Sequence, residues 1–141
     1  MKDKGGVMLL ASSFAAVFPS VGSGVYAATK SAVKSMVNTL AAELAPYGIR
    51  VNGYIPGVID TDMTHALTVS NGEAMKSAIA MQTFGEPMDV AWRLAFLASD
   101  YARYITGTTA GDQAAARWAC RTPPRRGRIR KPERNARKGG I

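Results

Sequence analysis

The sequence predicts an α/β fold built as a doubly wound parallel sheet. Two apolar runs, residues 7–12 and 50–55, have the continuous hydrophobic character of strands that are buried on both faces of a parallel sheet. The segment between them, residues 25–45, repeats apolar residues at the spacing of an amphipathic helix. Strands that alternate with helices of this length are typical of parallel sheets.

The first strand ends in two serines, Ser12 and Ser13. The carboxyl end of a strand is the usual place for ligand chemistry in open α/β sheets. Side chains alternate across a strand, so only one of the two hydroxyls faces a site at this edge. Residues 14–23 then form a loop rich in glycine, serine and proline.

The predicted helix over 25–45 carries its apolar stripe on Val33, Met36, Val37, Leu40, Ala41 and Leu44. Pro46 and Gly48 follow it, as expected at a helix end. The second strand, residues 50–55, is interrupted by Pro56 and Gly57.

Beyond this strand, residues 58–72 indicate a loop and residues 72–82 a short helix. A further helix begins at Glu86-Pro87, since proline is tolerated in a first helical turn. Its apolar positions are Val90, Ala91, Leu94, Ala95, Leu97 and Ala98.

Charge and hydrophobic pattern divide the chain into residues 1–109 and a tail, residues 110–141. The first part has eight basic and eight acidic side chains, whereas the tail has ten basic and two acidic ones and carries the whole net charge of +8. The tail is dominated by arginine, proline and glycine, so we expect it to be disordered. A shift of reading frame near codon 109 and a genuine extension both remain as interpretations of this tail.

The residues with the clearest chemistry are Tyr26 and Lys30, together with Ser13 thirteen residues before the tyrosine. Residues four apart on a helix share a face, so Tyr26 and Lys30 project into the same space. A phenol ordinarily has a pKa of about 10. A neighbouring cation lowers that value toward the range of general acid/base catalysis. When the pair is taken alone, a helical tyrosine beside a solvated lysine is the more frequent explanation.

Further segments follow in a set order and spacing: GIRVNGYIPG at 48–57, VIDTDM at 58–63, FGEPMDVA at 84–91, FLASD at 96–100 and YITG at 104–107. Together with the serine, tyrosine and lysine, they resemble the C-terminal half of the short-chain dehydrogenase/reductase family. The likeness is greatest to the branch of 3-oxoacyl-carrier-protein reductases, and it runs from Gly5 to Thr109. The resemblance implies part of a Rossmann-type sheet.

The resemblance also implies a role for each matching residue. Tyr26 exchanges a proton with the substrate oxygen, Lys30 assists it and binds the nicotinamide ribose, and Ser13 steadies the substrate. The turn at Pro56-Gly57 passes along the nicotinamide of NAD or NADP. The remaining cofactor contacts are the backbone of Ile59 and the hydroxyl of Thr61.

The function implied is hydride transfer between NAD(P) and a small carbonyl or alcohol substrate. The glycine-rich turn that anchors the pyrophosphate in this family does not occur before Val7. Activity of this chain alone is therefore doubtful, and the alternative is a non-catalytic remnant that at most binds a partner. Substrate, cofactor preference and reaction direction stay open.

Several other classes are excluded by the sequence. The charge-neutral first part gives no reason to expect nucleic-acid binding, and no apolar stretch approaches the roughly 18 residues of a membrane span. The start lacks the apolar core of a signal peptide, so we expect a cytoplasmic protein. No metal site is expected from the single histidine, His65. The family resemblance implies a homo-oligomer formed through the helix that carries Tyr26 and Lys30.

Overall fold

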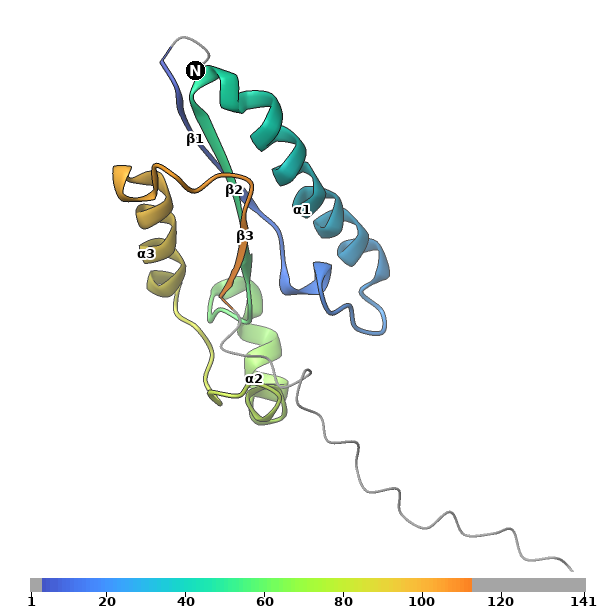
Figure 1. Ribbon diagram of the computed structural model, residues 1–141. Coiled ribbons are helices and arrows are strands. Elements are labelled where there is room, and N and C mark those ends of the chain that lie inside the picture. The colour runs from blue at the N-terminus through green and yellow to red at the C-terminus, as the bar shows by residue number, and fades with distance from the viewer. Residues whose placement is uncertain (1–3, 113–141) are drawn as a thin grey trace, which may run out of the picture.

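The computed structural model describes residues 4–112, and residues 1–3 and 113–141 lie outside the described part. A parallel sheet of strand order β1-β2-β3 forms its centre, with β1 at Gly6–Ala11, β2 at Ile49–Pro56 and β3 at Thr109–Asp112. Helices α1 (Gly24–Leu44) and α3 (Pro87–Ala98) cover opposite faces of this sheet (Figure 1). Helix α2 (Asp62–Ser77) lies beyond the carboxyl ends of the strands.

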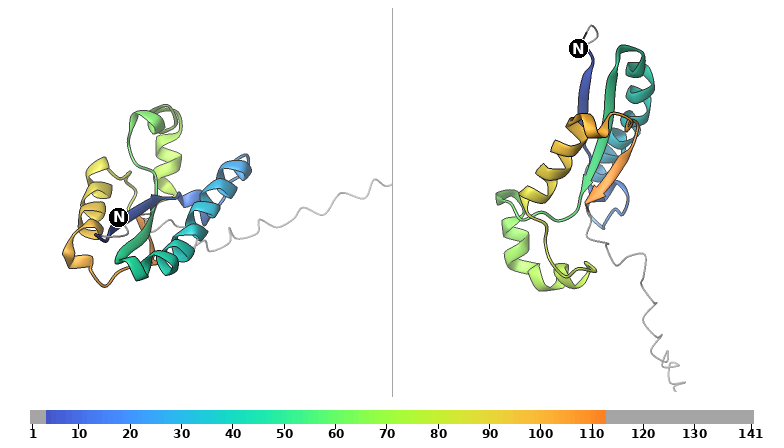
Figure 2. Two further views of the ribbon diagram at one scale, coloured as in Figure 1. Left: turned by 90° about the horizontal axis from the view of Figure 1, so that it is seen from above. Right: turned by 60° about the vertical axis from the view of Figure 1, so that its left-hand side comes forward.

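Residues 4–112 also contain three short 3-10 helices, at Phe14–Ala16, Ala45–Tyr47 and Asp100–Ala102. The views in Figure 2 show α1 and α3 flanking the sheet from two further directions. The α/β fold with a parallel sheet, expected from the sequence, is therefore confirmed. The predicted helix end is also confirmed, because Gly48 follows the 3-10 turn after α1 in a left-handed conformation, with φ 66°.

Strand register places β2 at the centre of the sheet. Val7 of β1 lies opposite Arg50, and Gly53 of β2 lies opposite Thr109 of β3. A central parallel strand is covered on both faces, which explains the apolar sequence of β2 and its near-complete burial. Helix α1 packs on this strand through a core of Ala41, Ile49 and Val51, joined by Met8, Leu10, Leu40 and Leu44.

Gly53 allows α1 to approach the sheet closely. A Cβ atom at this position would lie 2.8 Å from Val37 Cγ2 and 3.1 Å from Thr109 Cγ2. Val37 is fully buried, so its side chain has little room to move aside. The glycine therefore sets how α1, β2 and β3 fit together.

Polar side chains of β2 hold the turn that leads into β3. The fully buried Asn52 donates from Nδ2 to the Ile105 carbonyl at 2.9 Å and accepts from the Thr108 N–H at 3.3 Å. The Arg50 guanidinium donates to the Leu97 carbonyl at 2.7 Å and to the Ser99 carbonyl at 3.1 Å. These bonds fasten the end of α3 and the start of β3 to the central strand.

Two local predictions are wrong. Residues 58–72, expected as a loop, contain most of α2, and the helix expected over 72–82 is the last part of α2, which ends at Ser77. The two pieces meet at a kink, where Asn71 has the non-helical angles φ −132° and ψ 17°. The threonines and serines of this segment, together with Asn71, have weak helix preferences, which is why its sequence indicates a loop.

The boundary expected after Thr109 also needs correction. Residues 110–112 belong to β3, which pairs with β2 in parallel register. The bonds of Thr108 to Asn52 and to the Gly53 N–H hold the start of this segment against β2, although its own sequence of Thr-Ala-Gly-Asp is not strongly apolar. The basic tail is expected to be disordered. From residue 113 onward, this tail lies outside the described part.

Candidate active site

Tyr26 and Lys30 lie on the first turns of α1, at the end of the helix that meets the carboxyl ends of the strands (Figure 1). The Lys30 ammonium donates to the Ala11 carbonyl, the last residue of β1, at 3.2 Å. The same nitrogen lies 5.8 Å from the centre of the Tyr26 ring. The structure thus brings the cation, the phenol and the end of β1 together.

The two serines after β1 have different surroundings, as the alternation along a strand predicts. Ser12 is buried, with 3% of its surface exposed, and its hydroxyl donates to the Lys30 carbonyl at 2.8 Å. Ser13 is half-buried, and its Oγ accepts from the Ala15 N–H at 3.2 Å, which caps the short 3-10 helix. Because Ser13 Oγ accepts this bond, its own hydrogen can be donated to a ligand.

The Tyr26 side chain stands at the surface, with 52% of its area exposed. This exposure, on the first turn of α1 directly after the loop 17–23, leaves the phenol accessible to a ligand. The preceding residues Val21 and Val25 are also strongly exposed.

The second group of expected site residues follows β2. Pro56 is the last residue of β2, and Gly57 comes directly after it at the carboxyl edge of the sheet. Ile59 forms an isolated parallel bridge with Gly85, supported by bonds from Asp60 N to the Gly85 carbonyl at 2.8 Å and from Gly85 N to the Val58 carbonyl at 3.0 Å. This bridge holds the segment before α2 against the segment after it.

Thr61 is the N-cap of α2, and its side chain is exposed. Its N–H donates to Thr64 Oγ1 at 3.0 Å, and the two hydroxyl oxygens lie 3.2 Å apart. The Thr64 hydroxyl also donates to the Ile59 carbonyl. Thr61 and Ile59 are thus held in one hydrogen-bonded turn at the base of α2.

Sequence reasoning missed the residues that hold these groups in place. The buried Ser12 hydroxyl and Gly85 make the contacts described above, and neither was expected to be part of the site. Strand alternation was a signal for Ser12, because a serine that turns away from a ligand must turn toward the packed helix. Gly85 could have been suspected from its place just before the Glu86-Pro87 helix start.

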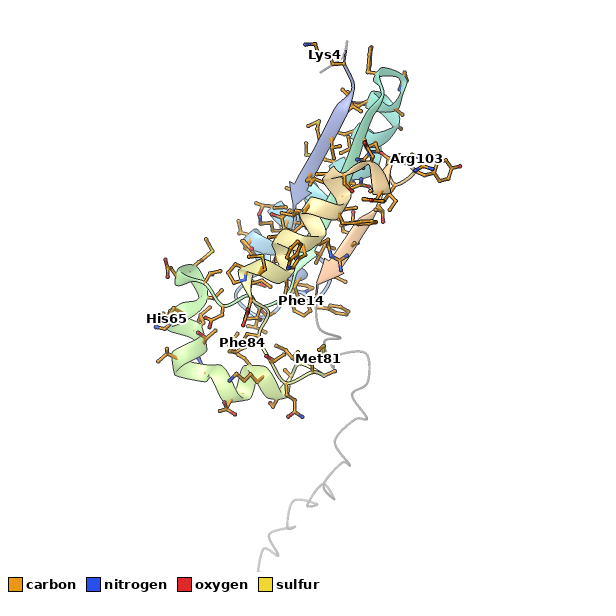
Figure 3. The ribbon with its side chains drawn as sticks, turned by 90° about the vertical axis from the view of Figure 1, so that its left-hand side faces the viewer. Lys4, Phe14, His65, Met81, Phe84 and Arg103 are labelled. Carbon is orange, nitrogen blue, oxygen red and sulfur yellow. The ribbon has the colours of Figure 1, made fainter. Side chains whose placement is uncertain are left out.

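His65 lies on the first turn of α2, where its backbone N–H donates to the Thr61 carbonyl at 2.9 Å, and its side chain is exposed (Figure 3). Among residues 4–112, no group of three or more histidine, cysteine, aspartate or glutamate side chains is arranged to hold a metal ion. Within the same part of the chain, no helix is both long and apolar enough to cross a membrane.

Comparison with known proteins places this arrangement in context. A family model described as Enoyl-(Acyl carrier protein) reductase matches residues 1–111. The 3-oxoacyl-[acyl-carrier-protein] reductase FabG of Staphylococcus epidermidis is 40% identical over 109 residues, which cover 77% of this chain and 45% of that protein. Human dehydrogenase/reductase SDR family member 4 is 42% identical over 110 residues, covering 77% of this chain and 40% of that protein.

Solved structures agree with these relatives. A short-chain dehydrogenase/reductase from Brucella melitensis superposes with a TM-score of 0.73 at 34% identity, covering 77% of this chain and 44% of that one. A 4-hydroxyisoleucine dehydrogenase complexed with NADH gives a TM-score of 0.73 at 30% identity, covering 78% and 46%. The chain therefore spans less than half the length of each relative named here.

Proposed function

Because the chain belongs to the short-chain dehydrogenase/reductase family, we propose that it forms the reaction half of an NAD(P)-dependent oxidoreductase. The proposed reaction transfers a hydride between a nicotinamide cofactor and a small carbonyl or alcohol substrate. The carrying observation is the position of the Lys30 ammonium, bound to the Ala11 carbonyl two residues before Ser13 and 5.8 Å from the Tyr26 ring.

Each of the three side chains has a role in this proposal. Tyr26 gives its proton to the substrate oxygen in reduction, or takes the proton from an alcohol in oxidation. The Lys30 charge stabilises the negative charge that develops on the Tyr26 oxygen as the proton leaves. Ser13 donates its hydroxyl hydrogen to the same substrate oxygen, which orients the carbonyl.

The residues after β2 fit the nicotinamide end of a cofactor, which would supply or accept the hydride. Pro56 and Gly57 lie at the carboxyl edge of the sheet, where ligands of such folds bind. The exposed Thr61 hydroxyl and the Ile59 backbone, held in one turn, would contact the carboxamide. Tyr26 and Lys30 would contact the ribose. NAD and NADP are both compatible with this half of the site.

The test uses a joined protein. It consists of the N-terminal part of the Staphylococcus epidermidis relative, which this chain does not match, followed by this chain, and it is assayed for activity. We expect oxidation of NADH or NADPH, followed by absorbance, with at least one of a panel of aliphatic, aromatic and acyl-thioester carbonyls. The matched control carries the same junction with Ser13, Tyr26 and Lys30 all replaced by alanine. A folded joined protein that binds cofactor and turns over no carbonyl would favour the non-catalytic remnant.

We further propose that the assembled protein is a homo-oligomer through α1. The outward face of this helix has the small exposed residues Ala28, Ala32 and Ser35, flanked by Val25 and Met36, which are 84% and 50% exposed. Small residues allow two helices to approach closely. Ala32→Glu in the joined protein should shift its sedimentation toward the monomer, whereas Lys34→Glu on the same helix should shift it less. Unchanged sedimentation of the Ala32→Glu protein would exclude this interface.

A further inference from the structure

Ser12 is a buried polar side chain that the proposed reaction does not use. Burying a hydroxyl costs free energy unless it forms a hydrogen bond. The Ser12 hydroxyl meets this requirement across elements, since it donates to the Lys30 carbonyl of α1 at 2.8 Å. The backbone N–H of Ser12 donates to the Tyr54 carbonyl at 3.0 Å, so Ser12 itself is anchored to β2.

Lys30 is consequently bound to the end of β1 at two points. Its carbonyl accepts from Ser12, and its ammonium donates to the neighbouring Ala11 carbonyl at 3.2 Å. The bond from Ser12 sets the position of α1 along β1, and the bond to Ala11 sets the direction of the Lys30 side chain. A lysine ammonium on its four-carbon stem would otherwise sample many positions.

We propose that Ser12 is a positioning residue for Lys30, a role that rests on the proposed function of the site. Its hydroxyl holds the second turn of α1 against the end of β1, and this keeps the Lys30 ammonium beside Ala11 and Tyr26. Ser13, the next residue along the chain, is held by the same strand end. One buried hydroxyl thus sets the separation between the candidate serine and the tyrosine–lysine pair.

Substitution of Ser12 by alanine isolates this role. A carbonyl oxygen has two lone pairs, so the Lys30 carbonyl keeps its bond within α1 when the serine bond is lost. The alanine removes the donor together with its need for a partner, so no buried polar group is left unsatisfied. The sheet and the helix should therefore persist in Ser12→Ala, which far-ultraviolet circular dichroism checks.

The test measures how fast Lys30 of the full chain is reductively methylated, by peptide mass spectrometry, relative to the exposed Lys34 one turn later. We expect Lys30 to react more slowly than Lys34, and Ser12→Ala to raise the Lys30 to Lys34 ratio about fivefold, the effect of losing one net hydrogen bond. The matched control is Ser31→Ala, which removes a 3.4 Å bond from the adjacent residue of α1 to the Ala16 carbonyl. Its ratio should stay unchanged.

Three results would overturn the proposal: equal methylation of Lys30 and Lys34 in the unsubstituted chain, an unchanged ratio in Ser12→Ala, or an equal rise in Ser31→Ala. Methylation requires no turnover, so these results stand whether or not the proposed reaction occurs. In the joined protein, Ser12→Ala should lower kcat about fivefold while the KM for the carbonyl changes less than twofold. A parallel loss in Ser31→Ala would indicate a merely structural effect.

Discussion

The chemistry proposed for this chain depends on three side chains that come from two elements. Tyr26 and Lys30 share one face of α1 because they are four residues apart, and Lys30 reaches back to the end of β1 beside Ser13. The tyrosine is exposed to a ligand, whereas the lysine is partly shielded between helix and strand. This division suits a proton-transfer group assisted by a fixed charge.

Replacement of the tyrosine is the sharpest test at this scale. In the joined protein, Tyr26→Phe should lower kcat by roughly 10²–10⁴-fold, because the proton donor is lost while the ring is retained. Steady-state kinetics measures the loss, and Tyr47→Phe, in the 3-10 helix that follows α1, serves as the control with near-normal turnover. A Tyr26→Phe protein with unchanged kcat would end the assignment.

Substitutions of Lys30 and of Ser13 should differ in their effects on cofactor affinity and on turnover. Lys30→Met should lower turnover and weaken binding of NAD(P)H together, because one ammonium serves both the tyrosine and the ribose. Ser13→Ala should lower turnover with little change in cofactor affinity. Fluorescence titration of NADH or NADPH beside turnover measurements distinguishes the two patterns. An equal loss of cofactor affinity in both variants would contradict these roles.

At the scale of elements, the position of the site depends on how α1 packs on β2. The close approach at Gly53 brings the helix to the strand. Because β1 and β2 are parallel and Ala11 pairs with Tyr54, Ser13 and Pro56 both follow at the carboxyl edge of the sheet. The Ile59–Gly85 bridge holds the base of α2 beside that edge. A substitution that changes how α1 packs on β2 should therefore displace the site residues even when none of them is itself substituted.

Gly53→Ala should destabilise the chain by about 1–3 kcal/mol, since the added methyl group meets the buried Val37 at 2.8 Å. Denaturant unfolding followed by circular dichroism measures this change. Gly24→Ala is the matched control, because no atom lies within 4 Å of a Cβ there and α1 begins at that residue. Equal midpoints for the two variants would show that the packing at Gly53 is looser than described.

For the whole molecule, we expect the described residues to supply one side of the proposed site. The residues proposed for proton transfer and for contact with the nicotinamide lie in this sequence, whereas the printed residues contain no glycine-rich turn of the kind that would hold a pyrophosphate. Helix N-termini and backbone N–H groups of such a turn bind the phosphates of a dinucleotide. Reaction chemistry and cofactor anchoring therefore reside in different stretches of the family's domain.

It follows that the 141-residue chain by itself should show no micromolar affinity for NADH or NADPH in titration calorimetry. The joined protein should bind one of the two, because the N-terminal part of the relative restores the anchoring turn. A joined protein in which that turn is broken by replacing its glycines with valine serves as the control. Micromolar binding by the chain as printed would refute the expectation.

Sequence alone determined the elements whose signals are local. The apolar run before Ser12, the helical stripe from Val33 to Leu44 and the Glu86-Pro87 helix start each depend on neighbours a few residues away, and the structure confirms the strand and both helices. The family follows from the same residues, since spacing and order are properties of the chain. The roles of Ser13, Tyr26 and Lys30 stay predictions.

Only the tertiary structure decided the features that join distant residues. Asn52 and Thr108, 56 residues apart, fasten β3 to the sheet although the sequence indicated no strand there. The extent of α2 and the inward turn of Ser12 toward Lys30 are likewise set by contacts between elements. Periodicity reports which face of an element is apolar, but a hydrogen bond between segments depends on where packing places both, and that information is spread over the whole fold.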